Sequence, residues 1–467
     1  MYSPLSPQSS VLSPKVLVVG GGLAGMAAAV ALESAGISVT LIEARRTLGG
    51  RAGSFQDPQT GEILDNCQHV LLGCCTNLID FYKRIDALSL IRFERTIHFL
   101  GPDGRRWDLT GTPGLPAPLH LGLAFARFGL LTLRQRRQVA EAMIAILSQP
   151  HPDIPLSQWL AEHGQDDELI RRLYDPIVIS GLNEQTRISS AAYALKIFHD
   201  SLLINSRGFL FGLPTCPLGK LYGRLPLRDL RLGVRLGELI FEGRRFTAAK
   251  TQDGQTIPAG AVILATNYHS LAGWIPPDLA AADSRFSQLD RLENSPILGA
   301  HLWFDRPVLT TSHLALVDGP LQWLFRKDQQ GAQVHGVISA ARQWLSVPRE
   351  EALKQFEAQV RSALPDVRGA TLKRGVVVIE KRATFSPLPG VDAFRPSQAP
   401  PFGGIGNLFL AGDYTRTGWP ATMEGAVRSG YLAADAVLRR LDSGCEHRTF
   451  LVDDLQAQWP ARLLTGV

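Results

Sequence analysis

The chain has 467 residues, of which 45% are hydrophobic and 19% charged. This length exceeds what a single hydrophobic core usually supports, so we expect a globular protein with two intertwined domains. The formal net charge of +5 favours an anionic partner, either nucleic acid or a membrane surface. The sequence has no recognisable nucleic-acid-binding module and no Cys/His spacing typical of a metal site. We therefore predict no nucleic-acid partner and no metal, and we favour the membrane.

The first segments of the chain predict a tail, a strand, a helix and a second strand. Residues 1–14 are rich in serine and proline and lack the pattern of a signal peptide, so we expect a disordered tail. Val16–Val19 is a short apolar, β-branched run, which is typical of a buried parallel strand. An alanine-rich stretch predicts a helix over Leu23–Ala35, and a further apolar run predicts a strand over Val39–Ile42.

Three glycines lie in the turn between the first strand and the helix. Gly20, Gly22 and Gly25 fit G-x-G-x-x-G, which allows a tight turn, close approach of the backbone to a pyrophosphate, and close helix packing. Glu43 lies 23 positions after Gly20 (43 − 20), close to where an acidic residue accepts hydrogen bonds from a ribose 2′-OH. The unit therefore predicts a dinucleotide-binding Rossmann fold, with a phosphate at the N-terminus of the helix.

Two further segments favour flavin over nicotinamide. Gly49, Gly50 and Arg51 follow the second strand, where backbone N–H groups and a guanidinium can reach another face of the pyrophosphate. Near the C-terminus, Leu408–Asp413 predicts a strand that ends in a carboxylate, and a long helix begins at Met423. With these segments, the chain resembles the flavin-containing amine oxidase and phytoene desaturase superfamily, in which both ends of the chain close on one FAD.

The resemblance implies an α/β fold class. In it, a Rossmann-type FAD-binding domain, glutathione-reductase-like, is interleaved with an α+β substrate-binding domain. The sequence shows no internal repeat and no linker long enough to separate independently folding domains. We assign residues 15–75, 215–275 and 397–441 to the FAD-binding domain, 76–214 and 276–396 to the substrate-binding domain, and 442–467 to a C-terminal extension. Two further helices are predicted within these domains, over residues 217–225 and Arg349–Ala363.

The resemblance also implies which residues hold FAD. The helix that begins at Met423 would direct its N-terminus to the pyrimidine end of the flavin ring, where it stabilises negative charge. Trp419 and Pro420 would wall the ring, with plain packing as the alternative, and Leu239 would contact adenine through its backbone. The predicted FAD-binding residues are Gly20, Gly22, Leu23, Ala24, Gly25, Glu43, Ala44, Arg45, Gly49, Gly50, Arg51, Leu239, Ala265, Gly412, Asp413, Trp419, Pro420, Ala421, Thr422, Met423 and Ala426.

A narrower resemblance rests on three segments, Asp65–Gly73, Leu173–Asn183 and Thr417–Ala426, with an amphipathic helix predicted over Thr76–Ile85. They are similar to the hydroxysqualene dehydroxylases, squalene-associated flavin proteins of hopanoid-producing bacteria. Cys67 stands where the pattern Asp-Asn-Gly-Gln-His of that family has glycine. The resemblance implies that a hydride from reduced FAD replaces the allylic hydroxyl of hydroxysqualene, which yields squalene.

Such a reaction needs a proton donor or a group that stabilises a cation, because hydroxide is a poor leaving group. The chain after Arg51 is expected to form a hairpin that turns near residues 57–61 and returns through residues 63–73 beside the flavin ring. Asp65 and His69 lie on the returning strand and are therefore the first candidates. A structural role is the alternative for each: a satisfied histidine for His69, and a turn or cofactor-loop residue for Asp65. Tyr174 and Asp175 are the next candidates, and Asp175 could equally cap a helix.

The segment 113–139 differs in character from its surroundings. Three prolines precede an apolar run, Leu119–Leu133, and the arginines Arg134, Arg136 and Arg137 follow it. We expect an interfacial helix that docks on a membrane, and the alternative is a helix whose apolar side packs in the core. The five cysteines suggest reduced thiols. We therefore predict a cytoplasmic protein, peripherally associated with the inner face of the cytoplasmic membrane.

Three functions remain open at this point. The first is hydroxysqualene dehydroxylation, with a long hydrophobic isoprenoid as the substrate. The second is a phytoene- or carotene-type desaturase, which uses the same scaffold oxidatively. The third is a non-catalytic FAD protein that carries prenyl lipids. The chain has no second G-x-G-x-x-G, so the electron donor that reduces FAD is unknown.

Overall fold

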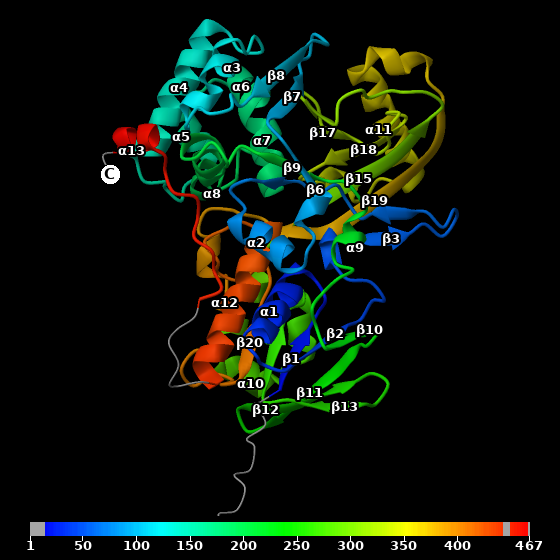
Figure 1. The fold of residues 1–467 in the computed structure, drawn as a ribbon, viewed down its shortest axis with the longest axis vertical. Helices are drawn as coiled ribbons and strands as arrows, with labels where there is room; N and C mark the ends of the chain where they lie inside the picture. Colours follow the sequence, from blue (N-terminus) through cyan, green and yellow to red (C-terminus); the bar gives the residue numbers. More distant parts are fainter. Residues whose placement is uncertain (1–14, 442–448, 466–467) are drawn as a thin grey trace, which may run out of the picture.

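The computed structural model describes residues 15–441 and 449–465 (Figure 1). The predicted disordered tail, residues 1–14, lies outside the described residues, as do 442–448 and 466–467 of the predicted C-terminal extension. Two large sheets, three small ones and a group of helices make up the described part, and strands that are far apart in sequence combine in each of the two large sheets.

The first sheet is parallel and joins the beginning, the middle and the end of the chain. Its order is β10 (Asp229–Leu232), β2 (Val39–Glu43), β1 (Val16–Val19), β14 (Ala261–Leu264) and β20 (Leu408–Leu410). Every residue of β1 and β14 is buried, which explains why these strands are continuous apolar runs. A small antiparallel sheet lies beyond it, formed by β11 (Leu236–Glu242), β12 (Arg245–Thr251) and β13 (Thr256–Pro258).

Two helices lie side by side against the parallel sheet, α1 (Leu23–Ser34) and α12 (Met423–Leu441) (Figure 1). They touch through small residues. A Cβ at Gly430 of α12 would lie 2.2 Å from the carbonyl oxygen of Ala24 in α1, so only glycine permits this approach. The two helices predicted at Leu23 and Met423 are confirmed, and they join the two ends of the chain.

The segments that we predict to form the substrate-binding domain contribute a sheet of seven strands. Its order is β19 (Leu372–Phe385), β15 (Asn294–Phe304), β18 (Gln333–Ile338), β17 (Trp323–Arg326), β16 (His313–Leu316), β7 (Thr96–Leu100) and β8 (Arg106–Thr110). The helix α11 (Arg349–Ala363) has the bounds that the sequence predicts. Its Phe356 ring packs on β18, where a Cβ at Gly336 would lie 2.3 Å from the ring.

Short elements connect the two large sheets. The hairpin of β3 (Ser54–Gln56) and β4 (Ile63–Asp65) precedes a small sheet of β5 (Leu71–Leu72), β9 (Phe211–Pro214) and β6 (Ile91–Glu94). The amphipathic helix predicted over Thr76–Ile85 is confirmed as α2 (Thr76–Arg84). The helix predicted over residues 217–225 forms only as α9 (Leu218–Leu221).

The remaining helices are mostly short, and apart from α10 (Pro277–Ala282), which lies in the lower part of Figure 1, they lie in its upper part. The run Leu119–Leu133 was predicted as one helix, either docked on a membrane or packed in the core, and it does not form one helix. The run is divided into η3 (Leu119–Leu121), α3 (Gly122–Ala126) and a turn, because Thr132 starts a new helix with a reciprocal cap from Gln135. The other helices are α4 (Leu133–Ser148), α5 (Leu156–Glu162), α6 (Asp167–Leu169), α7 (Asp175–Leu182), α8 (Ala191–Phe198), α10 (Pro277–Ala282) and α13 (Trp459–Thr465).

Candidate active site

The glycine turn after β1 leaves room for a phosphate. Gly20 has φ +114, and a Cβ there would lie 2.5 Å from the oxygen of Ala265. A Cβ at Gly25 would lie 1.9 Å from the oxygen of Gly20, so this glycine lets α1 pack against the turn. A Cβ at Gly22 meets no protein atom within 4 Å, and no side chain caps α1 at this residue. The open space therefore faces uncapped N–H groups, the arrangement that binds phosphate.

Glu43 ends β2 beside the same turn. One carboxylate oxygen accepts a hydrogen bond from the N–H of Gly21 at 2.6 Å, and the other accepts one from the N–H of Arg45 at 2.7 Å. These bonds fix the carboxylate at the carboxyl end of the strand, where a ribose would lie. Nearby, the carbonyl oxygens of Glu43 and Arg45 accept hydrogen bonds from the N–H groups of Val234 and Gly233. These two residues lie just before β11, the strand that carries Leu239.

The double glycine lies against the glycine turn. The N–H of Gly49 donates to the oxygen of Gly21 at 2.8 Å, and Gly49 and Gly50 have φ +104 and +59. Arg51 then reaches the end of the chain, because its guanidinium donates to both carboxylate oxygens of Asp413, at 2.5 and 2.9 Å. The structure thus joins two predicted FAD-binding segments that lie 362 positions apart.

The segment before α12 contains a buried N–H group without a partner. Trp419 is buried, and within the described residues its indole Nε1 has no hydrogen-bond acceptor. The Lys196 ammonium lies 4.8 Å from the centre of the indole ring, and the Arg428 guanidinium lies 5.6 Å from it. An unpaired donor among positive charges suits an electron-rich acceptor, such as the pyrimidine end of a flavin ring. Together with the space at Gly22, this site fits FAD.

The predicted hairpin connects the double glycine to the seven-stranded sheet. Asn66 donates to the oxygen of Gly50 at 3.1 Å, so the hairpin lies next to the double glycine. The Asp65 carboxylate is buried and accepts three hydrogen bonds: from Ser54 Oγ at 2.8 Å, from the Leu218 N–H at 2.8 Å, and from Lys327 Nζ at 3.2 Å. All three partners donate, which suits a carboxylate that holds the hairpin in place.

Cys67 and His69 lie in the segment that follows the second strand of this hairpin, between β4 and β5. His69 Nδ1 donates to the oxygen of Cys67 at 3.0 Å, and burial lowers the pKa of His69 below its ordinary value. A neutral ring with Nδ1–H leaves Nε2 as a hydrogen-bond acceptor. Cys67 is buried and has no positive φ, so the backbone accommodates cysteine where the resembled family has glycine.

Two buried histidines beneath the hairpin were missed by the sequence analysis. His301 on β15 and His335 on β18 face each other in register, with ring centres 4.0 Å apart. His301 Nε2 donates to the backbone oxygen of Asp65 at 2.9 Å. Within the described part of the chain, His301 Nδ1 and both nitrogens of His335 have no partner. Burial and the neighbouring His301, Lys327 and His69 lower the pKa of His335 well below its ordinary value, so its ring is neutral.

Tyr174 and Asp175 lie elsewhere, at the start of α7. Tyr174 is fully buried, and its hydroxyl donates to Gln165 Oε1 at 3.1 Å. Asp175 is the first residue of α7, and burial raises its pKa. No hydrogen bond links either residue to the hairpin among the described residues. The motif instead reaches the large sheet through Asn183, whose amide donates to Ser295 and Thr384.

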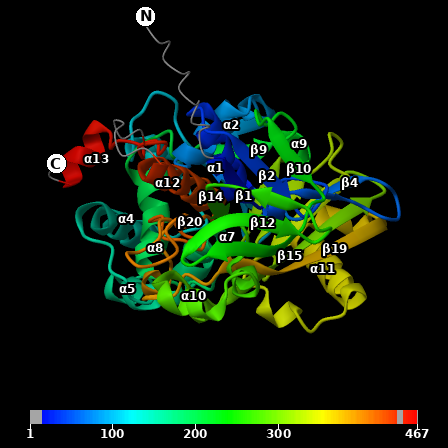
Figure 2. The same ribbon diagram turned by 90° about the horizontal axis from the view of Figure 1, so that it is seen from below.

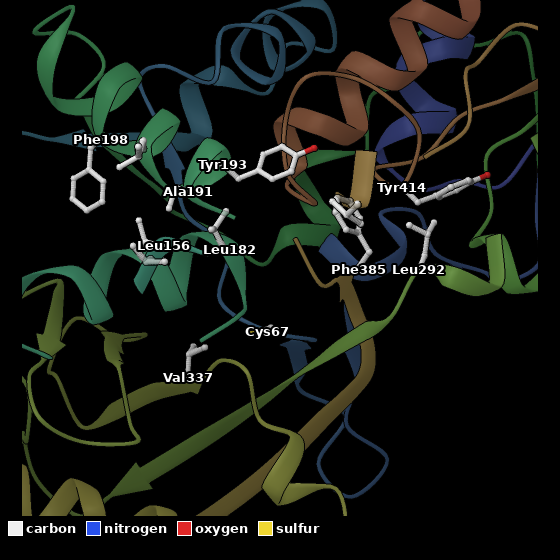
Figure 3. Close-up of a cluster of buried hydrophobic side chains, with 14 of the residues drawn as sticks. Cys67, Leu156, Leu182, Ala191, Tyr193, Phe198, Leu292, Val337, Phe385 and Tyr414 are labelled. Carbon is white, nitrogen blue, oxygen red and sulfur yellow. The ribbon is translucent and has the colours of Figure 1, made fainter. Parts of the chain in front are cut away.

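A cluster of buried apolar side chains, which we call the apolar wall, includes residues of α5, α7, α8, β18 and β19 (Figure 3). Figure 3 shows side chains from α7 and α8 on one side, with Cys67 and Val337 below them. Phe385 and Tyr414 lie on the other side, and Tyr414 follows the predicted FAD-binding residue Asp413. All of these residues are buried. The apolar wall belongs to the hydrophobic core that packs these helices against the large sheet.

Comparison with known proteins agrees with this geometry. The family model described as flavin containing amine oxidoreductase matches residues 23–438. A hydroxysqualene dehydroxylase of Sinorhizobium fredii is 29% identical over 91% of this chain and 98% of the relative. A 15-cis-phytoene desaturase of Synechococcus elongatus is 26% identical over 92% of this chain and 96% of the relative.

Solved structures show the same fold. A putrescine oxidase bound to putrescine superposes with a TM-score of 0.67 at 17% identity, over 91% of this chain and 99% of that chain. A protein described as a putative protoporphyrinogen oxidase, from Exiguobacterium, gives 0.64 at 18% identity, over 91% and 98%. These findings confirm the predicted fold class and the predicted cofactor. The chain therefore belongs to the flavin-containing amine oxidoreductase family and is an FAD-dependent oxidoreductase.

Proposed function

We propose that this protein removes the hydroxyl group of hydroxysqualene reductively and releases squalene. Relatives of similar identity include hydroxysqualene dehydroxylases as well as phytoene and ζ-carotene desaturases, so family membership leaves both reactions open. The observation that favours dehydroxylation is the pair of buried histidines beneath the hairpin, His301 and His335, in which three of the four ring nitrogens have no partner within the described residues.

The histidine pair distinguishes a substrate with a hydroxyl from a pure hydrocarbon. A buried polar group without a partner costs about 1–3 kcal/mol. Neutral His335 has one N–H donor and one acceptor nitrogen, and a substrate hydroxyl can bond to either of them because it both donates and accepts. A polyene such as phytoene can satisfy neither. The pair would therefore add binding energy for hydroxysqualene that a desaturase substrate cannot obtain.

The residues of this chain would then divide the work. The reaction needs a hydride, which reduced FAD supplies when it is bound, and a proton that converts the departing hydroxide into water. His335 would hold the hydroxyl oxygen, and the Asp65 carboxylate would stabilise positive charge that develops on the allylic carbons. His69, Tyr174 and Asp175 remain candidates for the proton transfer.

The long isoprenoid also bears on where the protein works. About thirty carbons, at ~0.8 kcal/mol per CH₂-sized group, favour an apolar phase by on the order of 20 kcal/mol. Such a substrate would arrive from a bilayer. No helix in residues 15–441 or 449–465 has the length and apolar character needed to cross a membrane. We therefore propose peripheral attachment to the inner face of the cytoplasmic membrane, and an external electron donor.

An anaerobic assay tests the proposed reaction. FAD in the purified protein is reduced chemically, hydroxysqualene is added, and flavin reoxidation is followed together with squalene formation. Equal amounts of oxidised flavin and squalene would support dehydroxylation. Bleaching of oxidised flavin by phytoene, without reoxidation by hydroxysqualene, would make the protein a desaturase. No reaction with either substrate would favour the prenyl-lipid carrier.

A pair of variants tests the role of the histidines. His335→Leu should retain FAD but lose turnover with hydroxysqualene, because the hydroxyl has lost its partner. His120→Leu is a matched control, since His120 is equally buried and unpartnered but lies in η3, away from the hairpin. Equal turnover in His335→Leu and the parent would refute the assignment. The earlier candidates are tested by Asp65→Ala and His69→Ala, and parental rates with bound FAD would exclude each as the proton donor.

A further inference from the structure

Exposed apolar side chains gather at one end of the helical part. Of the fourteen large apolar side chains that are exposed among the described residues, eight lie in residues 115–144 and 459–464, which we call the docking face. Leu133 is 78% exposed and Leu463 is 75% exposed. The two parts of the docking face are neighbours, because α13 packs against α4 (Figures 1 and 2). A patch of this kind marks an interaction surface.

Hydrogen bonds hold the C-terminal part of the docking face in place. Gln458 Oε1 accepts from the N–H of Ala117 at 2.6 Å and from the N–H of Ser206 at 3.0 Å. Its own N–H donates to the oxygen of Ile204 at 2.8 Å. The start of α13 is therefore fixed between two loops.

A cavity of about 420 Å³ opens between these loops and α13. Leu115 and Trp459 of the docking face line one side of it, and Arg95 and Arg207 line it as well. Both arginines are exposed, and within the described ranges neither guanidinium has an ion-pair or hydrogen-bond partner. Two unpaired guanidinium groups at one cavity are suited to an oxyanion, and phosphate is the kind that guanidinium groups bind well.

We propose that this cavity binds the phosphate headgroup of an anionic membrane lipid while the docking face enters the apolar layer. Apolar side chains next to a cationic cavity are complementary to an anionic bilayer surface, where headgroup phosphates lie directly above the acyl chains. The inference extends the predicted docking segment, residues 113–139, to the C-terminal helix. It rests on the proposed peripheral attachment and is independent of the reaction at the flavin.

Vesicle binding tests the cavity directly. Full-length FAD-loaded protein is sedimented with vesicles of phosphatidylcholine alone, or of phosphatidylcholine with phosphatidylglycerol. The double variant Arg95→Gln/Arg207→Gln should bind the anionic vesicles about 30-fold more weakly than the parent, from the typical value for two basic residues near such a surface. The control, Arg235→Gln/Arg349→Gln, removes the same charge from exposed residues before β11 and in α11, and it should bind like the parent.

A second pair of variants tests the apolar part of the docking face. Leu463→Gln should weaken binding severalfold, whereas Phe402→Gln changes a fully exposed apolar residue outside the docking face and should have no effect. Equal losses in the two arginine double variants would mean unspecific attraction and would overturn the proposal. The proposal would also be overturned if the parent did not bind vesicles, even if inorganic phosphate alone bound at Arg95 and Arg207. None of these readouts depends on turnover, so failure of the proposed reaction is a separate result.

Discussion

Gly22 should be required for FAD and dispensable for the fold. In Gly22→Ala the new methyl group meets no protein atom within 4 Å, and φ −76 at this residue is comfortable for alanine. As an N-cap, alanine is less favourable than glycine by under about 1 kcal/mol. The methyl group would occupy the space in which the pyrophosphate approaches the backbone. Loss of at least one hydrogen bond to a charged phosphate costs about 1.5–3 kcal/mol, which weakens FAD binding roughly 10- to 150-fold.

Gly25→Ala should give the opposite pattern. Its Cβ would lie 1.9 Å from the oxygen of Gly20, so the turn must open by about 1 Å or more before α1 can pack. Overpacking of this kind costs typically about 1–3 kcal/mol even without the cofactor. The two neighbouring glycines therefore separate a requirement of the ligand from a requirement of the fold.

Two measurements on apoprotein distinguish these outcomes. Thermal unfolding without FAD should show a clear loss for Gly25→Ala and little change for Gly22→Ala. Titration with FAD is followed by quenching of flavin fluorescence. For each variant, the loss of FAD affinity is compared with the loss of thermal stability, and this ratio should be larger for Gly22→Ala than for Gly25→Ala. Parental FAD affinity in Gly22→Ala would refute the placement of the pyrophosphate at this turn.

Three further predictions concern the polar groups around the site. Lys327→Met should lower the free energy of unfolding in urea by ~3 kcal/mol, because it leaves the buried Asp65 carboxylate without its cation. The second substitution Asp65→Asn, added to Lys327→Met, should restore part of this loss. If the two substitutions instead destabilise additively, the pairing is contradicted. Burial and Arg95 lower the pKa of His120 to about 4 from 6.5, so the stability due to its neutral form is fully present above pH 6.5 and is lost as the pH falls towards 4. Between pH 7.5 and pH 5, the free energy of unfolding in urea should therefore fall by about 2 kcal/mol less for His120→Leu than for the parent. Identical pH dependence of the two proteins would contradict this. Trp419→Phe should weaken FAD binding at least about fivefold if its unpaired N–H donates to the flavin, and an unchanged titration with FAD would show that it does not.

Local patterns in the sequence predicted the nucleotide-binding unit well. The first strand, the glycine turn, the helix and the second strand follow one another within about thirty residues, and each is specified by its own residues. The bounds of α11 were also predicted, because its apolar residues recur with helical spacing between Pro348 and Leu364. The structure adds that Asp413, 362 positions later, binds Arg51. No local pattern can reveal such a pairing.

Two expectations were not met because local chemistry outweighed hydrophobicity. The run Leu119–Leu133 is apolar enough for one helix, but the capping box of Thr132 and Gln135 begins α4 and breaks the run. The sequence contains this signal as T-x-x-Q directly before the basic cluster. The helix predicted over residues 217–225 ends at Leu221, ahead of Gly223, which is a poor helix former.

The histidine pair could not be predicted for a different reason. His301 and His335 each stand alone in an apolar strand, where a single histidine is most simply read as part of the core. They come together only because β15 pairs with β18 in a register that brings the ring centres to 4.0 Å. The strand pairing also places them under Asp65, whose backbone oxygen binds one ring while its carboxylate binds Lys327. Specificity for a hydroxyl group would then depend on the register of two strands far from the glycine motif.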